Sequence, residues 1–479
     1  MNKKRTKLIC TIGPASADKE TLRDMILAGM DAARLNFSHG SYPEHKEKID
    51  LIKELRAELE LPVAVILDTK GPEIRTGIFE GGAAELKEDQ TFTIETEDCV
   101  GNAERCCTSY EALARIVKPG DRILIDDGLI GLSVDESDGV RVRCTVRNGG
   151  VVKDRKSINL PGVHLDLPAM SDRDKDDIEF GIEQDVDFIA ASFIRKASDV
   201  REIRKFLAVL SGQQIKIISK IENREGVDNI DEIIAASDGV MVARGDLGVE
   251  IPPEEVPLIQ KEIIKRCNSH GKFVITATQM LDSMIRNPRP TRAEVADVAN
   301  AVLDGTDVIM LSGETASGKY PLEAVKMMVD VAVAAESAIG HSRLSRDRRS
   351  SSGGGRDVTG AIGFCTVNSA DSLRAKAIVT PTSSGNTALM ISKHRPKSKI
   401  IAFSLNERVV RQLSLVWGVT AYRMERLDDQ QEFFRDVIRH CMRLNLMNEG
   451  DIIVITAGVP LGISGGTNMM RIHEIGQPF

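Results

Sequence analysis

A lysine and a glutamate lie two residues apart at the end of a strand candidate. Lys220 belongs to the isoleucine-rich run 215–221, and Glu222 directly follows that run. Side chains two residues apart on a β-strand leave it on the same face. The two charges alone would favour a structural ion pair. Other charged residues at the ends of similar runs favour a chemical role.

A second carboxylate, Asp246, follows another strand candidate, after Arg244 and Gly245. Glycine has no Cβ, so the neighbouring backbone N–H groups can approach an anion. Glu222 and Asp246 offer oxygens to Mg²⁺ or Mn²⁺, hard cations that usually leave other positions to water and substrate. We predict a metal site suited to phosphate or enolate chemistry. The alternative is a helix-capping aspartate and a surface glutamate.

Four oxygen-bearing residues stand at the ends of two earlier strand candidates: Asn36 and Ser38 at the first, Asp68 and Thr69 at the second. This set offers neither nitrogen nor sulfur ligands and would suit a second, hard, monovalent cation. Spacing alone gives a weak signal, because serine and asparagine after strands are ordinary turn formers. Both interpretations stay open from spacing alone.

The formal net charge of −8 gives the chain no general attraction to nucleic acid. An anionic ligand must therefore meet basic residues gathered at one site. Four such residues stand at or near strand ends: Arg34, Arg75, Lys220 and Arg244. Phosphoryl transfer needs this arrangement, because the protein mainly positions groups and neutralises charge. The sequence has neither a Walker A loop nor a kinase glycine-rich loop.

Short apolar runs alternate with helical patterns and would position these residues. Eight runs occur, at 8–13, 32–37, 63–68, 186–193, 215–221, 239–244, 273–278 and 307–312. Strands alternating with helices imply a parallel sheet, and eight of them suggest a closed barrel with catalytic groups at the carboxyl ends of the strands. Thr291 stands three residues before Glu294 and predicts a capping box. We predict an α/β protein with a (β/α)8 TIM-type barrel in residues 1–70 and 169–342.

Two other regions depart from this alternation of apolar runs and helices. Residues 71–168 contain short β-rich runs with Gly and Asp turns, so we expect an inserted β-barrel-like lid domain between the third and fourth barrel strands. The polar, glycine-rich run 343–356 predicts a flexible connection. Beyond it, apolar runs at 375–380, 400–404, 419–424 and 451–456 predict a C-terminal α/β regulatory domain in residues 356–479.

The 479 residues are 42% hydrophobic and 28% charged, as in ordinary globular proteins. The eight cysteines show no zinc-type spacing, so we expect reduced thiols. Neither a signal peptide nor an apolar run of membrane-spanning length is found in the sequence. We therefore expect a cytoplasmic protein without a membrane or nucleic-acid partner.

Many runs of the sequence resemble the pyruvate kinase family, and the resemblance spans all three regions. The matching runs are 11–14 (TIGP), 34–40 (RLNFSHG), 68–75 (DTKGPEIR), 220–223 (KIEN), 241–248 (MVARGDLG), 276–280 (TATQM), 287–294 (NPRPTRAE), 304–307 (DGTD) and 311–315 (LSGET). Together these motifs are very specific. The resemblance implies the last step of glycolysis: phosphoenolpyruvate gives its phosphoryl group to ADP, forming ATP, and the remaining enolate is protonated to pyruvate.

The resemblance also implies two metal sites. Glu222 and Asp246 would hold Mg²⁺ (or Mn²⁺). Potassium ion, K⁺, would be held by Asn36, Ser38, Asp68 and the carbonyl of Thr69. Glu73 is similar to the glutamate of the family's potassium-dependent members, where potassium-independent members have lysine. We therefore expect activation by K⁺.

Roles for the cationic and hydroxyl side chains follow from the same resemblance. Lys220 would stabilise charge on the phosphoryl group and the enolate, while Arg34 and Arg75 would hold phosphates. Arg34, His39 and Lys156 would approach the nucleotide, with the lid closing over ADP.

The substrate carboxylate would be bound at the turns after two later strands. The resemblance assigns this task to the backbone N–H groups of Gly245 and Asp246, together with Thr278, while Lys220 would bind the substrate at its phosphoryl group and enolate. Thr278, with water and Ser312, would also belong to the route that delivers a proton to the enolate.

A hydroxyl-rich turn in the C-terminal region resembles the family's allosteric loop. It comprises Thr382, Ser383, Ser384, Gly385, Asn386 and Thr387, between a strand and a helix, where phosphate binds readily. The alternative is a helix cap with spare serines. Asn386 stands where some members have a basic residue, so the resemblance does not identify the effector, for which a sugar phosphate and AMP are the candidates. Residues 458–468 resemble the second wall of that pocket.

Two other functions fit parts of this pattern. A metal-dependent pyruvate-enolate lyase or aldolase also uses a barrel and a Glu/Asp metal pair, but it needs no nucleotide lid. A non-catalytic sugar-phosphate sensor would retain only the C-terminal pocket, which the presence of Lys220, Glu222, Asp246 and Thr278 argues against. The resemblance implies a homotetramer, although the sequence itself reveals no interface.

Overall fold

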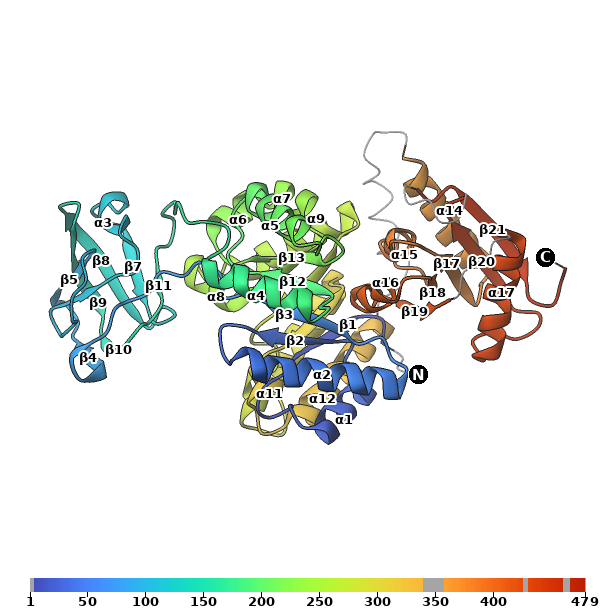
Figure 1. Ribbon diagram of the computed structural model, residues 1–479, viewed down its shortest axis with the longest axis horizontal. Coiled ribbons are helices and arrows are strands. Elements are labelled where there is room, and N and C mark those ends of the chain that lie inside the picture. The colour runs from blue at the N-terminus through green and yellow to red at the C-terminus, as the bar shows by residue number, and fades with distance from the viewer. Residues whose placement is uncertain (1–3, 339–356, 425–429, 460–465, 479) are drawn as a thin grey trace.

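The computed structural model describes residues 4–338, 357–424, 430–459 and 466–478. A central barrel lies between a β-sheet body on one side and an α/β body on the other (Figure 1). The predicted connection 343–356 lies outside the described residues. Within the described ranges, every helix is too short or too polar to span a membrane.

In the described part of the chain, eight parallel strands close into a barrel in the order β1-β16-β15-β14-β13-β12-β3-β2. Alternate residues face inward and outward, so Ile9 and Ile66 fill the interior while Leu8 and Leu67 pack against the helices. Each predicted run overlaps one of these strands, which confirms the barrel. Their bounds are β1 (Lys7–Thr11), β2 (Ala32–Asn36), β3 (Ala64–Asp68), β12 (Phe188–Ala191), β13 (Lys216–Ile221), β14 (Gly239–Ala243), β15 (Phe273–Ala277) and β16 (Val308–Leu311).

Helices surround the barrel and follow the strands along the chain. The predicted capping box is present at the start of α10, where Thr291 and Glu294 bond each other's backbone N–H groups. The bounds are α1 (Lys19–Ala28), α2 (Tyr42–Leu59), α4 (Asp172–Glu183), α5 (Ala197–Val209), α6 (Arg224–Asp228), α7 (Ile230–Ala236), α8 (Arg244–Glu250), α9 (Val256–His270), η2 (Asp282–Ile285), α10 (Arg292–Asp304), α11 (Gly313–Ala316) and α12 (Pro321–Ala338).

The inserted sheet domain interrupts the barrel between β3 and β12, which pair with each other in the closed sheet. It forms a six-stranded sheet in the order β11-β7-β8-β9-β5-β6 and a two-stranded ribbon of β10 and β4, around its own apolar core. The bounds are η1 (Glu80–Gly82), β4 (Ala83–Leu86), β5 (Thr91–Glu95), β6 (Arg105–Cys107), α3 (Leu113–Ile116), β7 (Arg122–Ile125), β8 (Ile130–Ser137), β9 (Arg141–Asn148), β10 (Gly150–Lys153) and β11 (Ile158–Asn159).

The C-terminal α/β body contains a five-stranded sheet in the order β19-β18-β17-β20-β21. The four predicted runs are parallel strands, while β21 pairs antiparallel with β20 and was not predicted. The bounds are α14 (Val358–Ser372), β17 (Ala377–Pro381), α15 (Asn386–Ser392), β18 (Lys399–Ser404), α16 (Glu407–Gln412), η4 (Leu413–Leu415), β19 (Val419–Arg423), α17 (Gln430–Arg443), β20 (Ile452–Ala457) and β21 (Met469–Glu474).

This C-terminal body packs against the amino ends of the barrel strands. Arg411 Nε lies 2.6 Å from Asp187 Oδ1, just before β12. Arg395 Nη1 lies 2.6 Å from Asp307 Oδ1, just before β16. Leu415 is fully buried and joins the cluster that fills the barrel interior. The carboxyl ends of the strands therefore remain free for a site at the opposite rim.

Candidate active site

Lys220 lies at the centre of a buried polar cluster at the carboxyl rim of the barrel. Its Nζ is 3.0 Å from Asp68 Oδ1 and 3.0 Å from Glu222 Oε1. It also donates a hydrogen bond of 2.7 Å to Ser192 Oγ. These partners come from the ends of β3, β12 and β13, which are neighbouring strands of the barrel sheet. The ion pair suggested by the spacing exists, but as part of a larger charged cluster.

The charges of this cluster decide the protonation of Lys220 and Asp68. Burial alone would lower the pKa of Lys220, but Asp68 and Glu222 outweigh it and raise that pKa well above its usual value. Burial alone would raise the pKa of Asp68, but Arg34 and Lys220 outweigh it and lower that pKa. Lys220 therefore stays an ammonium and Asp68 a carboxylate at neutral pH.

Glu222 is a buried acid whose surroundings favour its protonated form. Burial, reinforced by the negative charge of Asp246, raises the pKa of Glu222 to about 7, although Lys220 acts in the opposite direction. Its Oε2 accepts a 2.6 Å hydrogen bond from the N–H of Phe193. A cation between Glu222 and Asp246 would stabilise both carboxylates, so the donor set fits Mg²⁺ or Mn²⁺.

The two carboxylates are not accompanied by further metal-binding side chains. Across residues 4–338, 357–424, 430–459 and 466–478, no group of three or more His, Cys, Asp and Glu side chains is placed to hold a metal ion. A divalent ion here would complete its coordination with water and substrate oxygens, as Mg²⁺ commonly does.

The predicted oxygen-only set is brought together by the pairing of β2 with β3, in which Asn36 and Asp68 are register partners. Asn36 Oδ1 accepts a 3.1 Å hydrogen bond from the Ser38 N–H, so these residues also form the turn suggested as the alternative. The Thr69 carbonyl accepts a hydrogen bond from Ser192 Oγ. Carbonyl and carboxylate oxygens keep further lone pairs, so the set fits a monovalent cation.

Arg34 reaches the same carboxylate from β2. Its Nε lies 2.6 Å from Asp68 Oδ2, and its Nη1 donates a 2.9 Å hydrogen bond to Thr11 Oγ1. Both oxygens of Asp68 are thus engaged by cations, one by Arg34 and one by Lys220. The arrangement gathers two of the four predicted cations, Arg34 and Lys220, at the rim.

Thr278 occupies a strained turn directly after β15. The φ angles of Thr278 and Gln279 are +67° and +55°, a left-handed conformation that non-glycine residues rarely adopt. The Gly245 N–H donates a 2.7 Å hydrogen bond to Thr278 Oγ1, so the turns after β14 and β15 are joined. Strain of this kind is typical of functional sites. Gly245, Asp246 and Thr278 are therefore together, as expected for the carboxylate site.

Ser312 stands at the end of β16 with its hydroxyl unused. Its Oγ is buried and has no hydrogen-bond partner among the described residues. Its backbone N–H donates to Glu314 Oε2 at 2.7 Å. A buried hydroxyl without a partner is costly, which makes Ser312 a candidate for contact with a bound molecule or water.

The remaining predicted nucleotide and phosphate residues do not join the Lys220 cluster. Arg75 Nε lies 2.8 Å from Glu73 Oε2, and Lys156 Nζ lies 2.8 Å from Asp126 Oδ1. Both cations are therefore paired with acids of the insertion or its entry. His39 is exposed on the loop after β2. Bringing Arg75 and Lys156 to the cluster would require the inserted sheet domain to move toward the barrel, whereas His39 already belongs to a barrel loop.

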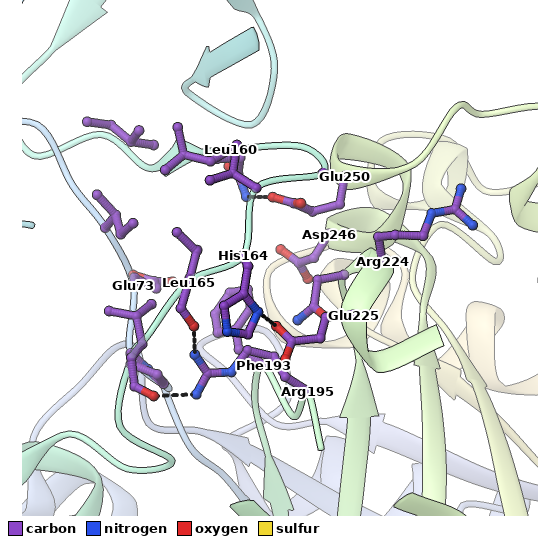
Figure 2. Close-up of a pocket in the computed structure, with 18 of the residues that line it drawn as sticks. Glu73, Leu160, His164, Leu165, Phe193, Arg195, Arg224, Glu225, Asp246 and Glu250 are labelled. Carbon is purple, nitrogen blue, oxygen red and sulfur yellow. Dashed lines mark hydrogen bonds and ion pairs between the residues drawn. The ribbon is translucent and has the colours of Figure 1, made fainter. Parts of the chain in front are cut away.

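A cavity of about 280 Å³ lies where the inserted sheet domain returns to the barrel (Figure 2). Leu160 and Leu165 lie on the side of the returning chain, and Glu225 and Asp246 lie on the barrel side. Asp246, a candidate metal ligand, therefore contributes to the wall, so the cavity adjoins the site.

Contacts around this cavity tie the returning chain to the barrel. His164 Nδ1 lies 3.1 Å from Glu225 Oε2, and Asn159 Nδ2 donates to Glu250 Oε1 at 3.1 Å (Figure 2). Burial raises the pKa of Glu250, with the Asn159 hydrogen bond acting against that rise. These residues could not be singled out from the sequence, because neither periodicity nor spacing shows that they meet.

The predicted effector turn keeps its shape through its own hydroxyls. Gly385 has φ +88°, which suits glycine, and its N–H donates a 2.9 Å hydrogen bond to Thr382 Oγ1. Thr387 Oγ1 and Thr467 Oγ1 lie 2.9 Å apart, so the turn contacts the second predicted wall. Residues 460–465 of that wall lie outside the described residues.

Comparison with known proteins places the chain among enzymes of one kind. Two family models match: "Pyruvate kinase, barrel domain" over residues 3–325 and "Pyruvate kinase, alpha/beta domain" over residues 360–473. The pyruvate kinase of Clostridium acetobutylicum is 50% identical over 472 residues, covering 98% of this chain and 99% of the relative. That of Geobacillus stearothermophilus is 52% identical over 475 residues, covering 99% of this chain and 81% of the relative.

A solved structure agrees with the sequence comparison. The crystal structure of a pyruvate kinase from Cryptosporidium parvum aligns with a TM-score of 0.94 and 43% sequence identity, covering 98% of this chain and 96% of that one. Barrel, insertion and C-terminal body therefore have the same arrangement in both proteins. With its clustered lysine and carboxylates at the barrel rim, the chain belongs to the pyruvate kinase family.

Proposed function

We propose that this phosphotransferase moves the phosphoryl group of phosphoenolpyruvate to ADP, with the residues at the barrel rim in the roles that the sequence predicted. Membership of the pyruvate kinase family supports the reaction. The main support for the site is the buried Lys220 ammonium, which forms ion pairs with Asp68 and Glu222. Asp246, the other candidate ligand of the divalent metal, lies beside them. Such a cluster can neutralise charge that moves between phosphate and enolate.

Two cations would complete this site. Glu222 and Asp246 would hold Mg²⁺ or Mn²⁺, and Asn36, Ser38, Asp68 and the Thr69 carbonyl would hold K⁺. When bound, the cations supply positive charge beside the transferring phosphoryl group. Glu73, now paired with Arg75, belongs to the motif on which the K⁺ requirement rests. Equal turnover when K⁺ is replaced by a bulky organic cation would contradict that requirement.

The side chains of the rim divide the work of binding and charge stabilisation. Lys220 faces the phosphoryl group and the enolate oxygen, and its raised pKa keeps it charged throughout. Arg34 and Arg75 hold phosphate oxygens. The N–H groups of Gly245 and Asp246 hold the substrate carboxylate, so the Gly245 N–H exchanges its present Thr278 partner for that carboxylate.

The enolate is then protonated along a hydroxyl route. Thr278 is positioned by its strained turn, and its Oγ1 donates to the Ala277 carbonyl. Ser312 offers a second buried hydroxyl, whose oxygen has no partner in the described residues. With water, these groups can pass a proton toward the enolate carbon.

The inserted sheet domain, residues 71–168, acts as a lid over the nucleotide. Closing it would bring Arg75 and Lys156 toward the barrel rim, where Arg34 and His39 complete the nucleotide site. The pairing of both lid cations with Glu73 and Asp126 is consistent with an open position. Exclusion of water from the closed cleft would favour transfer to ADP over hydrolysis.

Regulation and assembly belong to the C-terminal domain, residues 356–479, and to the barrel of residues 1–70 and 169–342. The effector, a sugar phosphate or AMP, would place its phosphate against Ser383, Ser384 and Thr387. If Ser384→Asp left activation by every tested phosphate unchanged, this site would be abandoned. We further propose a cytoplasmic homotetramer, in line with the sequence resemblance.

The test is pyruvate release from phosphoenolpyruvate and ADP with Mg²⁺, with and without K⁺. Wild type should be active only with ADP and a divalent ion, and chelation of that ion by EDTA should stop turnover. Lys220→Ala should lower kcat by about 100- to 1,000-fold, because the preorganised charge is lost. Lys205→Ala, an exposed lysine on α5, is the matched control and should behave as wild type.

The competing functions give different results in the same assay. Pyruvate chemistry that does not need ADP would indicate a lyase or aldolase. A folded wild type that stays inactive with sugar phosphates and AMP added would indicate the sensor. Either result would overturn the proposed function.

A further inference from the structure

Ser192 is a buried serine between two parts of the candidate site. It directly follows β12 and is 3% exposed. Lys220 Nζ donates to its Oγ at 2.7 Å, and that Oγ donates to the Thr69 carbonyl at 2.7 Å. One hydroxyl thus connects the candidate catalytic lysine with a candidate ligand of the monovalent cation.

The direction of these hydrogen bonds is fixed by chemistry. An ammonium can only donate, and a carbonyl oxygen can only accept. The Ser192 hydroxyl must therefore accept from Lys220 and donate to Thr69. Its single proton is directed at the Thr69 carbonyl, so the hydrogen bonds run from Lys220 through Ser192 to Thr69.

The backbone holds Ser192 and Thr69 in register. The Ser192 N–H donates to Thr69 Oγ1 at 3.3 Å, and the Thr69 N–H donates to the Ala190 carbonyl at 3.0 Å. The backbone at Gly71 lies close to this serine: a Cβ placed on Gly71 would lie 2.8 Å from Ser192 Cβ. The serine has little freedom to leave this position.

We propose that Ser192 is a positioning residue that couples the monovalent-cation ligands to Lys220. The inference rests on the proposed function, which assigns the Thr69 carbonyl to that cation. Asp68 provides a second connection, because its Oδ1 lies 3.0 Å from Lys220 Nζ and it belongs to the same ligand set. Binding of the monovalent cation and the position of the Lys220 ammonium therefore depend on each other, and the Ser192 hydroxyl is one of the two groups that connect them.

The test compares Ser192→Ala with Ser219→Ala. Ser219 is also fully buried and precedes Lys220 on β13, so its side chain leaves the opposite face, where its Oγ lies 2.6 Å from Ser237 Oγ. Thallium(I), a probe for potassium sites, is titrated into each protein with Mg²⁺ present and followed by ²⁰⁵Tl NMR. Turnover is measured in parallel as a function of K⁺ and of phosphoenolpyruvate.

Ser192→Ala should weaken thallium binding about fivefold, the effect of one lost hydrogen bond. It should lower kcat and raise the K⁺ concentration for half-activation, with a smaller change in KM for phosphoenolpyruvate. Ser219→Ala should leave all these values as in wild type. If Ser192→Ala loses stability, Ser192→Cys fills the same space with a weak hydrogen-bonding group and should give the same shifts.

The two readouts separate this inference from the proposed function. Thallium affinity that is unchanged in Ser192→Ala and Ser192→Cys would overturn the coupling, as would a wild type that binds no thallium. If the wild type forms no pyruvate but both Ser192 variants bind thallium more weakly than the wild type does, the coupling is supported and the proposed reaction is refuted.

Discussion

Arg244 stabilises the strained Thr278 turn through its planar guanidinium group. Its Nε donates to the Ala277 carbonyl at 3.2 Å, and its Nη2 donates to the Thr278 carbonyl at 2.7 Å. Nη1 lies 2.8 Å from Asp297 Oδ1. The sequence grouped Arg244 with the cations that would meet phosphate. The structure shows that its donors are used to hold the turn and the carboxylate of Asp297.

Arg244→Lys should lower kcat/KM for phosphoenolpyruvate by about 10- to 100-fold, because small displacements of substrate-positioning groups have effects of this size. Lysine keeps the charge but cannot reproduce the planar fork that reaches both carbonyls. Steady-state kinetics measure the effect. Arg266→Lys, on the exposed face of α9, is the control, and an equal loss in both variants would contradict the assignment.

At the scale of elements, the amino end of α10 is held by one carboxylate. Glu294 Oε2 accepts from the N–H and Oγ1 of Thr291, while its two oxygens accept from the N–H and Oγ of Ser283. Burial alone would raise the pKa of Glu294, but the hydrogen bonds from Ser283 and Thr291 outweigh it and lower that pKa. The helix start is thus coupled to the protonation of a single acid.

Glu294→Gln should lower the free energy of unfolding by about 1 kcal/mol at neutral pH, as loss of a helix cap does. The folded pKa lies below the unfolded value of about 4.3. The stabilisation is therefore complete above that value and is lost as pH falls through the folded pKa. Thermal unfolding of wild type and variant should converge toward acid pH. Glu323→Gln, an exposed glutamate on α12, should show no such convergence.

The returning chain of the inserted sheet domain, residues 160–168, is held by one arginine. The Arg195 guanidinium donates to the carbonyls of Leu165 at 2.9 Å, Leu167 at 2.6 Å and Pro168 at 3.2 Å. Arg195 is buried two residues before α5, and its Nε lies 3.6 Å from Asp199 Oδ2 in that helix. Three carbonyls on one side chain give the lid connection a fixed attachment to the barrel.

Arg195→Lys should increase the hydrogen exchange of amides in residues 160–168 by at least about tenfold, because each hydrogen bond to a charged group contributes about 1.5–3 kcal/mol. One ammonium cannot replace the fork to three carbonyls. Exchange followed by mass spectrometry locates the change. Arg201→Lys, exposed on the following helix α5, should leave these amides as in wild type. Unchanged exchange in Arg195→Lys would contradict the attachment.

At the scale of the whole molecule, the two ends of the barrel have different tasks. The carboxyl rim carries the candidate site beside the inserted sheet domain, while the amino ends are covered by the C-terminal body (Figure 1). Leu415 enters the barrel interior cluster from η4 and is fully buried. The predicted effector turn packs near the same segment, because a Cβ on Gly385 would lie 3.2 Å from Leu413 Cδ2.

Leu415→Ala should lower the free energy of unfolding by about 2–5 kcal/mol, because a cavity would remain at the base of the barrel. The loss should also weaken docking of the C-terminal body. Thermal unfolding and limited proteolysis measure the two effects. Leu405→Ala, an exposed leucine on the same body, should change neither. A Leu415→Ala protein as stable as wild type would show that the barrel interior does not depend on this residue.

Local patterns predicted the elements well, because their determinants are local. The alternation of apolar runs and helices indicated eight barrel strands, and the Thr291 and Glu294 spacing indicated the start of α10. The antiparallel strand β21 was missed, because Met469–Glu474 mixes apolar and charged residues without a distinct strand period. Its place in the sheet depends on pairing with β20.

The sequence by itself determined the kinds of groups available and the strand ends that carry them: Lys220, Glu222 and Asp246 could be named from residue type and spacing. Only the tertiary structure decided which groups touch. Ser192 meets Lys220 and Thr69 because the barrel brings β12, β13 and β3 side by side. Arg195 and Leu415 gained their roles from contacts between distant segments. Spacing along a chain fixes the face of an element, whereas contact between elements depends on closure and packing.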